Sequence, residues 1–129
     1  MRGEYRLLCQ SGGRGAFAHV IVEREEVTEP VSETVIIMPM VDDRGDLVHL
    51  RAEFIEAARD GCKAAIGAIG LPIGSEMRQI VKIATIRVNV ADTTPDAVKS
   101  AAFLATADSF GAAHQFTLQY KERWIIVPA

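Results

Sequence analysis

Apolar and polar residues alternate with the two-residue period of β-strands along the N-terminal part of the chain. Residues 4–9 alternate weakly, and Ala16–Glu23 is a stronger strand pattern because it is rich in β-branched residues. One face of that strand carries Phe17, His19, Ile21 and Glu23. The glycine-rich segment Ser11–Gly15 predicts a hairpin turn between the two strands. Glu33–Met40 is an apolar run short enough for a buried third strand.

From about Arg51 the apolar residues recur at the three- and four-residue steps of an amphipathic helix. The positions on this face are Phe54, Ile55, Ala58, Cys62, Ala65, Ile66 and Ile69. Gly67 and Gly70 are expected to end the helix, because glycine disfavours helix interiors and suits the residue that follows a helix.

The segment Ile80–Val90 has the longest strand pattern of the chain. Alternation places Ile86, Val88 and Val90 on one face and Thr85, Arg87 and Asn89 on the other. A second helix is expected to begin at Thr94, whose hydroxyl can cap free amides, with Pro95 and Asp96 suited to the first turn. It should close at Gly111, with an alanine-rich face packed on the sheet or on the other helix.

The C-terminal part contains two further extended segments, at Phe116–Tyr120 and Trp124–Val127. The order of elements predicts an α+β fold, with a mixed four- to five-stranded sheet and two helices on one face. The length of 129 residues suits one domain, over residues 1–129.

Composition and charge narrow the possible functions. The chain is 49% hydrophobic and 24% charged, which supports a folded core. Its net charge of −3 means that RNA binding needs a local basic patch. The N-terminal residues are polar and no apolar run approaches the ~18 residues of a membrane span, so a cytoplasmic protein without membrane partners is expected. Cys9 and Cys62 are expected to be thiols.

Known catalytic and ligand-binding motifs are absent from the sequence. Ser11–Gly15 lacks the lysine and the helix of a phosphate-binding loop, and Ala18 stands where a dinucleotide fingerprint needs its third glycine. The three histidines have no spacing that pairs them with a nucleophile. Asp42, Asp43 and Asp46 lack the downstream glutamate of a calcium loop. A non-enzymatic protein without cofactor, metal or nucleotide is expected.

Basic residues could gather on one surface of the sheet. Arg2, Arg6 and Arg14 belong to the first strand and first loop, and Arg87 and Asn89 share a face of the long strand. If these strands are adjacent, the side chains form a modest basic face for RNA. The alternative is an ordinary solvated sheet surface.

The segment Gln10–Val20 reads Gln-Ser-Gly-Gly-Arg-Gly-Ala-Phe-Ala-His-Val and resembles the opening of domain IV of translation elongation factor G. Glu53–Gly61 is similar to the first helix of that domain, and Asp92–Thr94 falls in the same order. The similarity covers roughly residues 3–111, and Ile125–Pro128 is similar to the segment that leaves the domain.

This resemblance implies the ribosomal protein S5 domain 2-like fold with a left-handed βαβ crossover. In the family, this domain reaches the decoding region of the small ribosomal subunit, where loops at its tip contact the codon–anticodon helix. The resemblance therefore implies two tip loops and neighbouring strand positions as the RNA- or ribosome-binding site. Its residues are Ser11, Gly12, Gly13, Arg14, Gly15, His19, Arg87, Asn89, Asp92, Thr93 and Thr94.

The chain also departs from the family pattern. The second tip loop is shortened and lacks the family's histidine, Ala16 replaces a glutamine, and no GTPase motif is present. The expectation is a domain IV-like module standing alone, which binds the small ribosomal subunit or RNA through the Arg14 loop. The alternative is a protein-interaction or self-associating domain that has lost RNA contact. An enzyme ranks last, because the phosphate loop of the kinases in this fold family is absent.

Overall fold

The alternating N-terminal segments form two long hydrogen-bonded strands in the computed structural model, which describes residues 1–11, 14–41, 44–70, 77–89 and 91–129. Strand β1 (Arg2–Ser11) pairs antiparallel with β2 (Arg14–Val27), as the predicted hairpin requires. The expected turn over Ser11–Gly15 is too long, because Ser11 pairs with Arg14 and both strands continue to these residues. Gly12 and Gly13 lie outside the described residues.

The main sheet is mixed and has the strand order β1-β2-β4-β3. Strand β4 (Arg78–Arg87) is antiparallel to β2, and β3 (Val35–Ile37) is parallel to β4. The third strand is shorter than the predicted Glu33–Met40, because after the Met38 amide bonds the Ile83 carbonyl oxygen the chain leaves β4 and enters the Val41–Leu47 bridge. The helix between β3 and β4 makes this parallel pair a crossover unit, whose hand stays a prediction.

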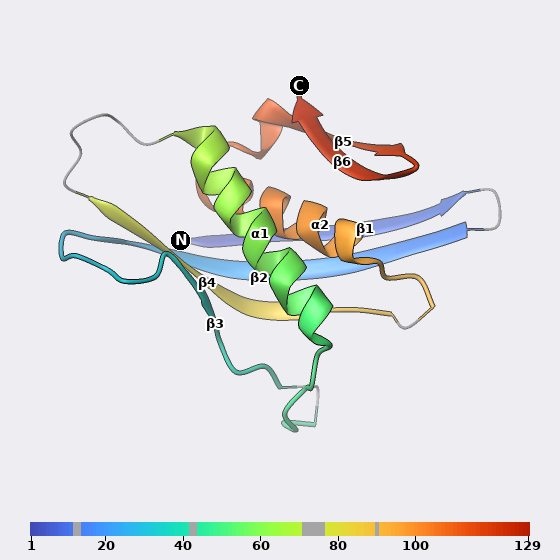
Figure 1. The fold of residues 1–129 in the computed structure, drawn as a ribbon, viewed down its shortest axis with the longest axis horizontal. Coiled ribbons are helices and arrows are strands. Elements are labelled where there is room, and N and C mark those ends of the chain that lie inside the picture. The colour runs from blue at the N-terminus through green and yellow to red at the C-terminus, as the bar shows by residue number, and fades with distance from the viewer. Residues whose placement is uncertain (12–13, 42–43, 71–76, 90) are drawn as a thin grey trace.

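Two helices cover one face of this sheet (Figure 1). Helix α1 spans Ala52–Ile69 and helix α2 spans Pro95–Ser109. Gly70 follows α1 with a φ of 71°, as expected for a helix end, but Gly67 lies within α1 and does not stop it. Thr94 occupies the predicted position before α2, yet its hydroxyl makes no capping hydrogen bond. Its carbonyl oxygen instead accepts the first helical hydrogen bond, from the Val98 amide at 3.2 Å.

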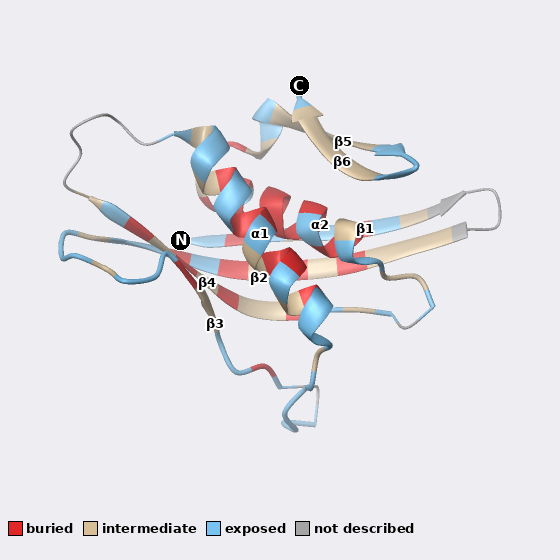
Figure 2. Cartoon of the chain, in the orientation of Figure 1, coloured by how far each residue is buried: buried red, intermediate tan, exposed pale blue. Residues whose placement is uncertain are grey.

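The core lies between the sheet and the two helices, where the buried residues concentrate (Figure 2). Alternation points Val20, Val22, Val81 and Ile83 inward, and each is fully buried. The alanine-rich face of α2 is buried as predicted. Gly61 permits close approach of the helices, since a Cβ built there would lie 3.0 Å from the Ala102 Cβ and closer still to the Lys99 carbonyl oxygen.

The two C-terminal strands were predicted correctly as extended segments, but they do not join the main sheet. Strands β5 (Phe116–Lys121) and β6 (Arg123–Pro128) pair only with each other among the described residues and form a separate hairpin. Phe116 packs edge-on against Phe103 of α2, with ring centroids 4.8 Å apart. The predicted α+β class is thus confirmed, with a four-stranded mixed sheet, two helices on one face and a small two-stranded sheet.

A buried arginine, which the sequence did not reveal, packs and hydrogen-bonds at the C-terminal end of α2. The Arg24 guanidinium donates hydrogen bonds to the Gln79 Oε1 at 2.6 Å, the Glu26 Oε1 at 3.0 Å and the Ser109 carbonyl oxygen at 3.1 Å. It also lies 4.0 Å from the ring centroid of Phe110. Because a charged group loses hydration on burial, these partners are what make its position tolerable.

Strand β1 forms one edge of the main sheet. The Asp108 carboxylate, from the last turn of α2, accepts a hydrogen bond from the Glu4 amide at 3.1 Å. A helix side chain therefore satisfies a backbone donor on this edge.

Candidate functional site

The two predicted tip segments meet at one end of the molecule. The Phe17 amide in β2 donates to the Asp92 carbonyl oxygen at 3.2 Å, and the Thr93 hydroxyl donates to the Phe17 carbonyl oxygen at 2.7 Å. Gly15 allows the contact, because a Cβ there would lie 2.8 Å from the Asp92 carboxyl group. The hairpin and the turn after β4 thus form one continuous tip.

Internal hydrogen bonds shape the second tip segment into a tight turn. The Asn89 side-chain oxygen accepts from the Ala91 amide at 3.0 Å, which is an Asx-type turn. The Asn89 amide donates to the Thr93 hydroxyl at 2.7 Å. Asn89 therefore does not share a strand face with Arg87 as predicted, because β4 ends at Arg87 and the Asn89 side chain is used within the turn. Val90 lies outside the described residues.

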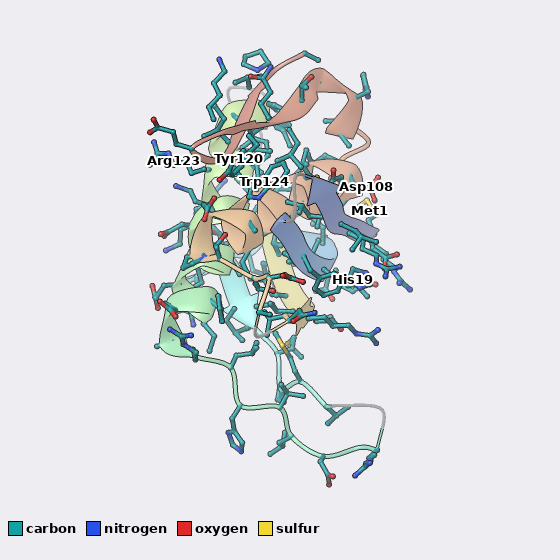
Figure 3. The ribbon with its side chains drawn as sticks, turned by 90° about the vertical axis from the view of Figure 1, so that its right-hand side faces the viewer. Met1, His19, Asp108, Tyr120, Arg123 and Trp124 are labelled. Carbon is teal, nitrogen blue, oxygen red and sulfur yellow. The ribbon has the colours of Figure 1, made fainter. Side chains whose placement is uncertain are left out.

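A row of basic side chains crosses the sheet face that the helices leave uncovered. Arg6 of β1 pairs in register with His19 of β2, and His19 pairs with Arg87 of β4. The first strand and the long strand are not adjacent as the basic-face hypothesis required, because β2 lies between β1 and β4. His19 of β2 instead links Arg6 to Arg87 across the same face. Figure 3 shows His19 on the side of the sheet away from the helices. The Arg6 guanidinium also lies 5.8 Å from the ring centroid of Phe17.

Some of the charged side chains on this face form ion pairs with neighbouring residues, and others do not. The His19 Nε2 lies 2.5 Å from the Glu4 Oε2, and this hydrogen bond lowers the pKa of the Glu4 carboxyl group. Lys82 pairs with a glutamate of β2 at 2.8 Å. Arg6 and Arg87 have no ion-pair partner within the described part of the chain. Among the side chains of this face that the structure describes, these two guanidinium groups are available to an external anion.

The remaining predicted site residues that the structure describes lie around the same tip. The backbones of Ser11 and Arg14 pair at the end of the β1–β2 ladder, and Thr94 stands at the start of α2. Arg2 lies at the other end of β1, where it pairs with Glu4 at 3.4 Å, so it does not extend the basic row.

A groove of about 630 Å³ lies on the helix side of the tip and was not predicted. Its walls include Gly15 of β2, Asp92 of the turn, Asp96 of α2 and the aromatic pair Tyr120 and Trp124 of the C-terminal hairpin. Figure 3 shows both aromatic side chains on the opposite side of the sheet from His19. The paired aromatic positions in two short strands were the available sequence signal.

Across the described ranges, no group of three or more His, Cys, Asp or Glu side chains is arranged to hold a metal ion. None of the described helices combines the length and apolar character needed to span a bilayer.

The fold and the tip define a small mixed α+β module with two surfaces of different chemistry at one end. No protein family model matches the chain, and no curated protein matches it in sequence. Solved structures do match, in 43 chains. One is a protein of Thermus thermophilus, similar over 86% of this chain with a TM-score of 0.58 and 23% identity. The match covers 16% of that chain, so this protein corresponds to a small part of it, and the similarity establishes the fold.

Proposed function

We propose that this chain is a non-enzymatic, cytoplasmic module of translation that binds RNA of the small ribosomal subunit through its tip and the adjoining basic row. The observation that carries the proposal is the register of Arg6, His19 and Arg87 across three neighbouring strands. The resemblance of Gln10–Val20 to domain IV of elongation factor G, in the ribosomal protein S5 domain 2-like superfamily, supports the same assignment.

The chemistry of the row suits a phosphate backbone. Arginine presents several donors in a planar fork that matches phosphate oxygens, and neither Arg6 nor Arg87 is neutralised by a carboxylate of the described residues. The overall charge of −3 would oppose binding elsewhere on the surface, so contact with RNA should be confined to this region. Phe17, beside Arg6, adds an aromatic surface on which an unpaired base could stack.

Co-sedimentation with purified small ribosomal subunits at low and moderate salt tests the proposal. The double variant Arg6→Ala/Arg87→Ala should bind more weakly and flatten the salt dependence by about two units, one for each lost phosphate contact. The single variant Arg14→Ala tests the first tip segment in the same assay. The control Lys63→Ala/Lys99→Ala removes two charges from exposed positions on the helices and should bind like the unaltered protein. Equal losses in both double variants would overturn the proposal.

The second candidate function is protein interaction or self-association through the same uncovered sheet face. It is favoured by apolar side chains there, because Leu8 is 61% exposed and Phe17 and Ile21 are half-buried. Sedimentation-equilibrium measurements over a range of concentrations should then detect a dimer that Leu8→Lys abolishes. Such an apolar association should persist at high salt, whereas RNA binding should not. A monomer at every concentration would argue against self-association.

A further inference from the structure

The groove on the helix side of the tip is large enough for a specific ligand. Its volume of about 630 Å³ falls within the roughly 300–1,000 Å³ typical of ligand sites. It opens between Cys9 of β1 and Gly15 of β2, the turn before α2 and the β5–β6 hairpin. The Phe17 amide bonds the Asp92 carbonyl oxygen at 3.2 Å, which holds β2 to that turn. The Trp124 amide donates to the Asp96 carboxylate at 2.6 Å, and this bond holds the C-terminal hairpin to the first turn of α2.

One wall of the groove is aromatic. Tyr120 and Trp124 are directly paired across the β5–β6 hairpin, with ring centroids 5.1 Å apart and ring planes inclined by 55°. Tyr120 remains 51% exposed, although a tyrosine of a small protein would usually cover more of its ring. Electron-rich ring faces of this kind attract cations, tryptophan most strongly.

The rim of the groove is acidic. Asp92, Asp96 and Glu122 contribute carboxylates to it, and none of its described lining residues is Lys, Arg or His. The N-terminus of α2 opposes them with about half a positive charge, which is smaller than the three negative charges. Lys121 and Arg123 flank Glu122 in sequence, but neither lines this groove. The described lining of the groove is therefore attractive to a cation and repulsive to a phosphate, while Lys99 and Arg123 line a separate pocket beside Asp96 and Trp124.

We propose that this groove binds an arginine side chain on an extended, basic segment of a protein partner. A guanidinium group can stack on an aromatic ring and donate to carboxylates at the same time, and it sheds water more readily than an ammonium group. The carboxylates would repel the RNA backbone, so RNA would contact the basic row and the side of the tip that continues it, and the groove on the helix side would serve a different partner. This inference goes beyond the proposed RNA contact and does not rest on it.

The test uses Trp124, which is the single tryptophan of the chain, as a fluorescent reporter of the groove. The unaltered protein is titrated with a capped pentapeptide that contains arginine between glycines, and with the same peptide carrying neutral citrulline instead of arginine. We expect saturable fluorescence change with the arginine peptide and at least about tenfold weaker binding of the citrulline peptide. Equal binding of the two peptides, or no change with either, would overturn the proposal.

Charge variants locate the binding site within the molecule. The double variant Asp92→Asn/Glu122→Asn should weaken arginine-peptide binding about tenfold. Asparagine suits residue 122, whose φ of 63° lies in the left-handed region, so the hairpin should be preserved. The control Glu56→Asn/Asp60→Asn removes the same charge from exposed positions of α1 and should bind normally.

The free thiol of Cys9 gives a second readout and separates the two partners. Cys9 lines the groove, whereas Cys62 is buried, so a maleimide should label Cys9 first and the arginine peptide should slow that labelling. Protection by a single-stranded RNA in place of the peptide would refute the inference. Loss of ribosome binding in the Arg6→Ala/Arg87→Ala variant with peptide binding intact would distinguish the two proposals.

Discussion

Replacing Gly61 with alanine probes the contact between the two helices. Gly61 lies in the interior of α1 and is buried against α2. An added Cβ would meet the Ala102 Cβ at 3.0 Å and would lie even closer to the backbone carbonyl oxygen of Lys99. A backbone oxygen within a helix cannot rotate away as the end of a flexible side chain can. The helices must therefore separate locally to accept the methyl group.

Two opposing effects set the magnitude of the change in stability. Alanine in place of glycine favours a helix interior by about 0.8–1.0 kcal/mol. Forcing extra volume into a packed interface typically costs about 1–3 kcal/mol, and the backbone contact puts Gly61→Ala at the upper end. The net effect should be a loss of about 1–2 kcal/mol in the free energy of unfolding. Gly67→Ala provides the matched control, because a Cβ at that position of the same helix meets nothing within 4 Å.

Urea denaturation followed by Trp124 fluorescence measures both variants. Gly67→Ala should gain about 0.5–1 kcal/mol, so the two alanine variants should differ by about 1.5–3 kcal/mol at an unchanged denaturant slope. Stabilisation of the protein by both substitutions to the same extent would refute the reasoning, because it would mean that α1 and α2 are not in close contact at Gly61.

Three further predictions concern other parts of the molecule. Arg24→Met should reduce the free energy of unfolding by about 2–3 kcal/mol, because the Ser109 carbonyl oxygen loses a charged donor. The control Arg2→Met, at an exposed position, should change it by less than about 0.5 kcal/mol. Similar values for the two variants would contradict the role of Arg24. Burial raises the pKa of Cys62 to about 11, so between pH 9 and 11 the thiol ionises in the unfolded chain but not in the folded one. The free energy of unfolding should therefore fall by up to about 1.4 kcal/mol per pH unit in this range. An equally steep fall in Cys62→Ala would show that Cys62 is not the cause. Thr93→Val removes the hydroxyl that bonds the Phe17 carbonyl oxygen, and hydrogen exchange of residues 89–93 should accelerate about tenfold; unchanged exchange would show that the hydroxyl does not hold the tip together.

Periodicity predicted β1, β2, β4 and α1, because each of them buries one regular face. Helix α2 is buried on nearly all sides from Ser100 to Ala107, and it was predicted from its start signals instead. Periodicity failed where one residue overrides the pattern. Gly67 is exposed and has no close neighbour, so α1 continues through it at a modest cost. Arg24 belongs to the inward face of β2, but in the sequence a charged residue at this position suggests that the buried strand has ended. Only its hydrogen-bond partners in the structure explain its burial.

Only those parts of the site that a local motif or the family resemblance covers could be predicted from the sequence. Alternation put Arg87 and His19 on strand faces, and the resemblance brought the hairpin and the Asp92–Thr94 turn to one tip. The groove depends on where the C-terminal hairpin docks, and Tyr120 and Trp124 have the same pattern whether they face a core or solvent. A two-residue period cannot say which sheet a strand joins, because that is decided by long-range packing such as the Phe103–Phe116 contact.

The hydrogen bond from the Glu4 amide to Asp108 has a consequence for behaviour at high concentration. A ten-residue edge strand such as β1 is a template on which another chain can add, and repeated addition leads to fibres. A second chain would have to displace the Asp108 carboxylate and pass the alternating charges of Arg2, Glu4 and Arg6. The Asp108 carboxylate and these charges thereby hinder another chain from adding to the β1 edge of the sheet.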